Sequence, residues 1–94
     1  MLLLTADTRL LGISETNSGS VTGGIINIRE IMQLALLSNA VGIILIHNHP
    51  SGSLIPSRKD IISTKKIKEL GVLMDINLRD HIILTSEDYA SIPF

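Results

Sequence analysis

The run Val41-Gly42-Ile43-Ile44-Leu45-Ile46, which leads directly into His47-Asn48-His49, decides the fold of this chain. The run is continuous, rich in β-branched residues and bounded by polar ones, which is typical of a central strand covered on both faces. A polar loop, residues 47–56, follows at its carboxyl end. The stretch therefore predicts a central strand with polar side chains gathered where it ends.

A helix is predicted before this strand. Asn27 can act as the N-cap of a helix from about Ile28 to Ser38, and Glu30 completes a pattern like a capping box. The apolar positions of this segment follow the helical spacing and form a wide stripe. We therefore expect the helix to be largely buried.

A second helix is predicted after the polar loop. Ser57 offers its N-cap, Asp60 occupies the third helical position, and Gly71 is expected to stop the helix. Asp60 shares one side of this helix with Thr64 and Ile67, at the i+4 and i+7 positions. Its carboxylate should therefore face the core rather than water.

The rest of the chain predicts strands. Residues 2–5 and 10–13 form a hairpin signal, 76–78 and 80–85 read as two further strands, and 86–94 forms a tail with a turn of helix. The element order β-β-α-β-α-β-β implies an α/β fold, a sheet layered with two helices.

Length and charge limit the classes of protein. The chain has 94 residues, eight Lys and Arg, nine Asp and Glu, and a formal net charge of −1. This length suits one domain, residues 1–94, and the balanced charge argues against non-specific polyphosphate binding by charge alone. No cysteine is present, which excludes disulfides, thiolate zinc sites and a cysteine nucleophile. Apolar runs fall far short of the ~20 residues of a membrane span, so we expect a cytoplasmic protein without a membrane partner.

The polar loop brings metal-binding residue types together. His47 and His49, at i and i+2 in extended chain, point to the same side and can aim two nitrogens at one ion. An inward carboxylate at Asp60 beside them is costly unless a positive charge compensates it. Two histidines and a carboxylate with an open fourth position make up a hydrolytic zinc site. The alternative is that these residues only terminate secondary structure.

The motif resembles a known family. His47-x-His49, seven residues and then Ser57-x-x-Asp60 is similar to the motif of the JAMM (MPN-plus) metal-dependent hydrolases. The fuller string His47-Asn48-His49-Pro50-Ser51-Gly52, with Leu78-Arg79-Asp80-His81-Ile82-Ile83-Leu84, resembles the RadC family, which is associated with DNA repair. The resemblance covers residues from about 2 to 91.

The resemblance implies a fold and a site. The fold would be a cytidine-deaminase-like α/β/α sandwich with a central mixed sheet, and we expect its N-terminal edge to be truncated. The zinc ligands would be His47, His49 and Asp60. Ser57 would be the catalytic residue that steadies the oxyanion formed from an amide carbonyl. A serine at this place is also an N-cap, and both roles can hold.

The sequence departs from the family's pattern at the general base. By resemblance, a glutamate about eight residues before Asp7 accepts a proton from water, and that position falls before Met1. Glu15, on a second strand expected to run on through Asn17, is the one nearby substitute and more often would face solvent. Without a base, turnover would fall ~10²- to 10⁴-fold while a zinc site persists. Whether the chain is an enzyme is therefore left open.

Two further features have ordinary and sharper interpretations. His81 could orient a metal ligand, but a lone histidine in a strand is more often a satisfied, partly buried residue. The second helix is locally basic, which usually marks a solvated face and less often an anionic partner such as DNA. Its basic residues are Arg58, Lys59, Lys65, Lys66 and Lys68.

Three functions follow as hypotheses. The first is a zinc-dependent hydrolase of peptide or isopeptide amide bonds. The second is a non-catalytic DNA- or protein-binding module in DNA transactions. The third is a scaffold that forms a homo-oligomer through an exposed first strand. Substrate specificity would reside in the loops around residues 18–24 and 51–55.

Overall fold

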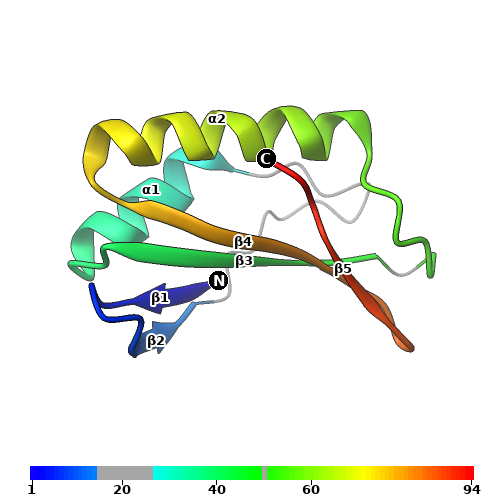
Figure 1. Ribbon diagram of the computed structural model, residues 1–94, viewed down its shortest axis with the longest axis horizontal. Helices are drawn as coiled ribbons and strands as arrows, with labels where there is room; N and C mark the ends of the chain where they lie inside the picture. The colour runs from blue at the N-terminus through cyan, green and yellow to red at the C-terminus, as the bar shows by residue number, and fades with distance from the viewer. Residues whose placement is uncertain (15–26, 50) are drawn as a thin grey trace.

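The computed structural model describes residues 1–14, 27–49 and 51–94. These residues form a five-stranded sheet, in the order β2-β1-β3-β4-β5, and two helices (Figure 1). The elements are β1 (Leu2–Leu4), β2 (Leu10–Ile13), α1 (Ile28–Leu37), β3 (Gly42–Asn48), α2 (Arg58–Met74), β4 (Asn77–Leu84) and β5 (Tyr89–Ser91). The predicted order of elements is confirmed as far as the second helix, whereas the last two strands are not the two that were predicted. Glu15, Asn17 and the loop 18–24 lie outside the described residues.

The sheet is mixed, as predicted. β3 and β4 run parallel, with α2 as the crossover between them, while the pairs β1–β2, β1–β3 and β4–β5 are antiparallel. A parallel pair requires such a crossover, because the chain must return to the starting end of the first strand before the second strand begins, and a tight turn is too short for this. The crossover places the carboxyl end of β3 and the first turn of α2 at one end of the molecule.

One hydrophobic core joins both helices to one face of the sheet. Ile43 and Leu45 alternate along β3 and share a cluster with Ile31 and Ala35 of α1 and Ile67 of α2. Figure 1 shows α1 and α2 together on this side of the strands. The α/β class with a central mixed sheet is confirmed. Of the layers of the implied sandwich, the described residues supply the sheet and one helical layer.

A β-bulge at Arg79 changes the face that β4 presents. Ile43 pairs with Leu78, whereas its neighbour Ile44 pairs with Asp80, so Arg79 is an extra residue on β4. The inserted residue lets Leu78 and His81, three positions apart, lie on the same face. The two strands predicted for residues 76–78 and 80–85 are therefore one bulged strand. The apparent break between them is the bulge.

The end of α2 and the C-terminal tail of the chain differ from prediction. Gly71 does not stop α2, which continues to Met74 and ends at Asp75 in the left-handed conformation, with φ 56°. Gly71 is buried instead, and a Cβ there would overlap the backbone carbonyl oxygen of Ile76. The tail forms β5 rather than a helical turn, because pairing with Ile82–Leu84 satisfies its backbone.

β1 is an interior strand. It pairs with β2 on one side and with β3 on the other, so the sheet edges are β2 and β5. The expectation of an exposed first strand is therefore wrong, because β2 and β3 already pair with β1 on its two sides. Neither described helix has the length and apolarity to cross a membrane.

Candidate metal centre

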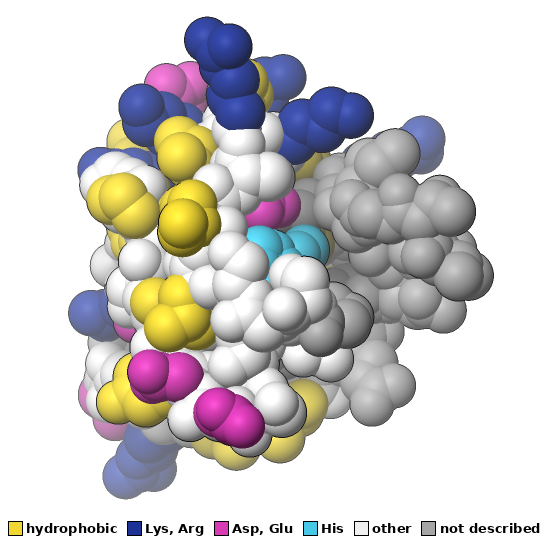
Figure 2. Space-filling view, turned by 90° about the vertical axis from the view of Figure 1, so that its right-hand side faces the viewer, with side chains coloured by type: hydrophobic (Ala, Val, Ile, Leu, Met, Phe, Trp, Pro, Cys, Tyr) yellow, Lys and Arg dark blue, Asp and Glu magenta, His cyan; other side chains and the backbone are white. Residues whose placement is uncertain are grey.

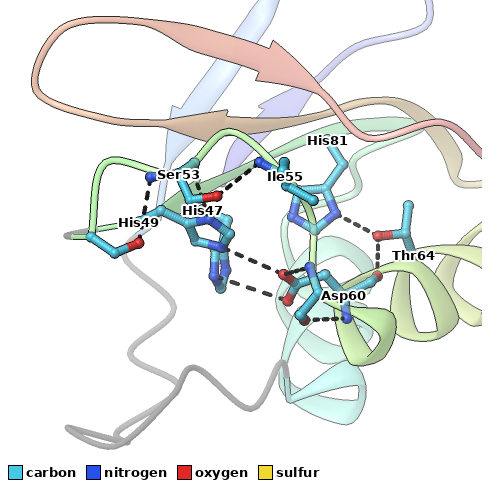
Figure 3. A network of polar contacts seen from close by, with 9 residues as sticks. His47, His49, Ser53, Ile55, Asp60, Thr64 and His81 are labelled. Atoms are coloured by element: carbon cyan, nitrogen blue, oxygen red, sulfur yellow. Dashed lines mark hydrogen bonds and ion pairs between the residues drawn. The ribbon is translucent and has the colours of Figure 1, made fainter.

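His47 and His49 lie at the carboxyl end of β3 with their rings side by side (Figure 3). The backbone N–H of His49 donates to the carbonyl oxygen of Leu84 over 3.0 Å, so the chain stays paired to β4 just past the strand end. This extended conformation puts both side chains on one face. Their ring centroids are 4.6 Å apart, at an interplanar angle of 82°.

Asp60 is brought to the histidines by the cap of α2. Its backbone N–H donates to Ser57 Oγ over 3.0 Å, and its Oδ2 accepts from the backbone N–H of Ser57 over 3.0 Å. This reciprocal pair is a capping box, which satisfies two otherwise free donors at the helix start. The carboxylate is thereby turned inward, and Asp60 is 4% exposed. The predicted N-cap role of Ser57 and the predicted inward orientation of the Asp60 side chain are confirmed.

The three side chains converge on one point. Asp60 Oδ1 lies 4.0 Å from His47 Nε2, and Asp60 Oδ2 lies 3.4 Å from His49 Nε2. One ligand atom from each residue lies within 4.8 Å of the others. The described part of the chain contains this one group of histidine and carboxylate side chains able to hold a metal ion. The structure thus assembles the three residues that the sequence pointed to.

A backbone contact sets the orientation of His49. Its Nδ1 lies 3.0 Å from the carbonyl oxygen of Ser53. A carbonyl oxygen can only accept, so Nδ1 carries the proton and donates it. In the neutral ring this leaves a lone pair on Nε2, which faces the Asp60 carboxylate. Sequence reasoning missed the part played by Ser53, because a carbonyl group carries no residue-specific signal.

Burial and hydrogen bonding set the charges of the group. Burial lowers the pKa of His47, with the neighbouring His49 adding to this effect and Asp60 opposing it. Burial alone would raise the pKa of Asp60. The hydrogen bonds from Ser57, together with the electrostatic effect of His47 and His49, outweigh burial, so the pKa of Asp60 is lowered. At neutral pH, His47 therefore presents a nitrogen lone pair and Asp60 a negative carboxylate.

This donor set fits a divalent cation. The nitrogen lone pairs and the carboxylate converge, and such an arrangement is unfavourable without a positive charge between them. Two imidazoles and a carboxylate match the ligands that hold zinc with an open position. The His47 and His49 side chains are 18% and 15% exposed, and Figure 2 shows histidine beside an acidic side chain at the surface. The group is therefore accessible from one side.

His81 is placed differently from the prediction. It is 1% exposed, rather than partly buried, because the bulge at Arg79 turns it toward α2. Its Nδ1 lies 2.7 Å from Thr64 Oγ1. Burial, the largest effect, lowers the pKa of His81 to about 4, so its ring is neutral at neutral pH. The ring centroids of His81 and His47 are 6.2 Å apart.

Comparison with known proteins is consistent across nearly the whole chain. The family model of the RadC-like JAB domain matches residues 1–93. A UPF0758 protein of Flavobacterium johnsoniae is 38% identical over 91 residues, covering 97% of this chain and 40% of that protein. A UPF0758 protein of Finegoldia magna is 42% identical over 90 residues, covering 96% and 40%. One from Staphylococcus aureus strain RF122 is 39% identical over 92 residues, covering 98% and 40%. The chain thus spans about two fifths of these relatives.

Proposed function

The chain belongs to the RadC-like JAB domain family, and from this premise we propose that it forms the centre of a zinc-dependent hydrolase of peptide or isopeptide amide bonds. The observation that carries the proposal is the convergence of His47, His49 and Asp60 within 4.8 Å of one another. The association of the RadC family with DNA repair gives the setting in which such an activity would serve.

The residues would divide the work as follows. His47 and His49 would hold the ion through Nε2, and Asp60 through its carboxylate. When bound there, zinc would supply a Lewis acid for an amide carbonyl and for the attacking water. Ser53, through its carbonyl oxygen, keeps His49 in the tautomer that a metal ligand needs.

Ser57 would act on the amide substrate. Its Oγ accepts a hydrogen bond from the backbone N–H of Asp60, which leaves its own hydroxyl proton free to be donated. A donor held next to Asp60 could stabilise the negative charge that develops on a carbonyl oxygen during attack. The cap and the proposed catalytic role therefore use different parts of the same hydroxyl.

Metal binding and turnover are separate expectations for this chain. Metal binding depends on the three ligands alone, whereas turnover also depends on a general base that accepts a proton from water. Metal content, rather than activity, is therefore the decisive test of the site.

The test is elemental analysis of the purified chain at neutral pH. We expect about one zinc ion per chain, lost in His49→Ala and in Asp60→Asn, because each removes one of three protein ligands. Asn48→Ala is the matched control, since Asn48 lies between the two histidines and is exposed. No zinc in the wild type after incubation with excess metal would overturn the proposal.

A non-catalytic DNA-binding role is the alternative. Its support is the exposed basic face of α2, where Lys65, Lys66 and Lys68 lie. Figure 2 shows several basic side chains along its upper edge, with others at the left and the bottom. This role predicts salt-dependent DNA affinity that is lost when Lys65 and Lys66 are both changed to Glu. No measurable DNA affinity in the wild type would exclude this role, and affinity unchanged in the variant would exclude the α2 face as the binding surface.

A further inference from the structure

A buried hydrogen-bonded chain links β4 to the backbone of Asp60. Thr64 Oγ1 lies 2.6 Å from the carbonyl oxygen of Asp60 and 2.7 Å from Nδ1 of His81. Thr64 is 0% and His81 is 1% exposed, so water does not compete for these bonds. Figure 3 shows His81 between Thr64 and His47, with Asp60 below them.

The direction of each hydrogen bond follows from counting protons. The Thr64 hydroxyl has one proton, and the Asp60 carbonyl oxygen can only accept. At 2.6 Å that proton belongs to the bond with Asp60. The Thr64 oxygen must then accept from His81, so the proton of the neutral His81 ring sits on Nδ1. The opposite assignment would set two lone pairs against each other inside the core.

The hydrogen bonds from His81 through Thr64 to Asp60 fix the first turn of α2 against the sheet. They tie the carbonyl of Asp60 to β4, the strand paired with β3, which carries His47. The capping box holds the same residue at its backbone N–H and its carboxylate. Asp60 is therefore restrained on both sides of its α-carbon, and its carboxylate has little freedom to turn away from the histidines.

We propose that His81, as the Nδ1–H tautomer, is a positioning residue that acts through Thr64 to hold Asp60 in the geometry that binds the metal ion. This inference rests on the proposed metal site and adds to it a role for two residues that do not contact the ion. Outer partners of metal ligands typically contribute 10- to 100-fold to metal affinity. The bulge at Arg79 is part of this arrangement, because it turns His81 inward.

The first test needs only the metal-free wild type. Long-range ¹H–¹⁵N correlation spectra distinguish a protonated from an unprotonated ring nitrogen. We expect His81 to show a protonated Nδ1 and an unprotonated Nε2 near neutral pH. A protonated Nε2 with an unprotonated Nδ1 would overturn the proposal, whether or not the protein binds zinc.

The second test measures cobalt(II) affinity and its visible absorption bands, which report the ligand geometry. Thr64→Val should weaken binding about 10- to 100-fold, and Thr64→Ser, which keeps the hydroxyl, should restore most of it. Ser63→Ala is the control, since it removes the hydroxyl of the residue next to Thr64 in α2, which takes no part in the hydrogen bonds between His81, Thr64 and Asp60. Affinity and spectrum unchanged in Thr64→Val would overturn the proposal.

A second pair of variants covers the case in which Thr64→Val does not fold. His81→Asn keeps an N–H donor near the position of Nδ1, whereas His81→Phe removes it. We expect tighter cobalt binding by His81→Asn than by His81→Phe, and equal affinities would contradict the proposed role. A wild type that binds no metal would instead refute the proposed function, while the tautomer measurement would still decide the state of His81.

Discussion

Asp60 shows how a single residue serves both the fold and the site. A buried carboxylate is costly unless hydrogen bonds and positive charge compensate it. The backbone N–H of Ser57 supplies one hydrogen bond, and its hydroxyl in return accepts from the backbone of Asp60. The two bonds form the start of α2 and aim the carboxylate, so local helix chemistry places a metal ligand.

The first prediction concerns Ser57. Ser57→Ala removes the side-chain half of the capping box and should lower the free energy of unfolding by about 0.5–2 kcal/mol. Urea denaturation of the metal-free protein measures this loss, with Ser57→Thr as the variant that retains the cap. A Ser57→Ala protein as stable as the wild type would show that the cap is not a stabilising contact here.

At the scale of secondary structure elements, α2 ends at a left-handed cap, Asp75, while Gly71 serves close packing inside the helix. Gly71 lies in the helix, and its carbonyl oxygen accepts from the backbone N–H of Ile76 over 2.8 Å. The chain returns so closely after Asp75 that a side chain at Gly71 has no room. The glycine therefore permits the approach of the β4 segment to α2.

The second prediction follows from this approach. Helix propensity alone would make Gly71→Ala stabilising by about 1 kcal/mol, but the added Cβ would meet backbone, which cannot move aside cheaply. We expect the overlap to dominate and to destabilise the protein by about 1–3 kcal/mol. Thermal unfolding measures the change. Gly12→Ala in β2 is the control, since a Cβ there meets nothing within 4 Å, and an increase in stability for Gly71→Ala would contradict the packing argument.

At the scale of the whole molecule, the site depends on elements far apart in sequence. β3 supplies His47, the loop after β3 fixes His49, α2 supplies Asp60, and β4 supplies His81. The pKa values of three of these groups, His47, Asp60 and His81, are all lowered in the folded protein. Their charge state links the stability of the fold to pH.

The third prediction is that acid destabilises the metal-free protein. Burial lowers the pKa of His81 from 6.5 to about 4, so between these values the unfolded chain binds more protons than the native state. Stability is therefore full above pH 6.5 and falls as pH decreases, reaching a loss of about 3 kcal/mol below pH 4. The lowered pKa values of His47 and Asp60 act in the same direction.

Denaturant unfolding at several pH values with a chelator present tests this prediction. The His81→Phe variant should show a shallower dependence between pH 6.5 and 4, because it lacks the main buried base. Stability that stays constant or rises as pH falls through this range would contradict the assignment of a buried neutral histidine.

Features encoded within a few residues could be predicted from the sequence. The apolar run 41–46 identified β3, the i and i+2 spacing put His47 and His49 on one side, and the Ser57 cap placed Asp60 in the first turn. Each depends on a short-range regularity, the period of a strand or the chemistry of a helix start. The family resemblance, carried by the same motif, is confirmed by the match over residues 1–93.

Other features depend on which segments meet in the folded chain. The bulge at Arg79, the close approach at Gly71, the Ser53 carbonyl behind His49 and the placement of both helices on one face all arise from packing between distant elements. The bond between Thr64 and His81 joins residues 17 positions apart. Backbone carbonyls and long-range pairings have no residue-specific signature, so the tertiary structure alone decides them. The residues of the site could therefore be predicted from the sequence, whereas the groups that hold them in place are determined by the tertiary structure.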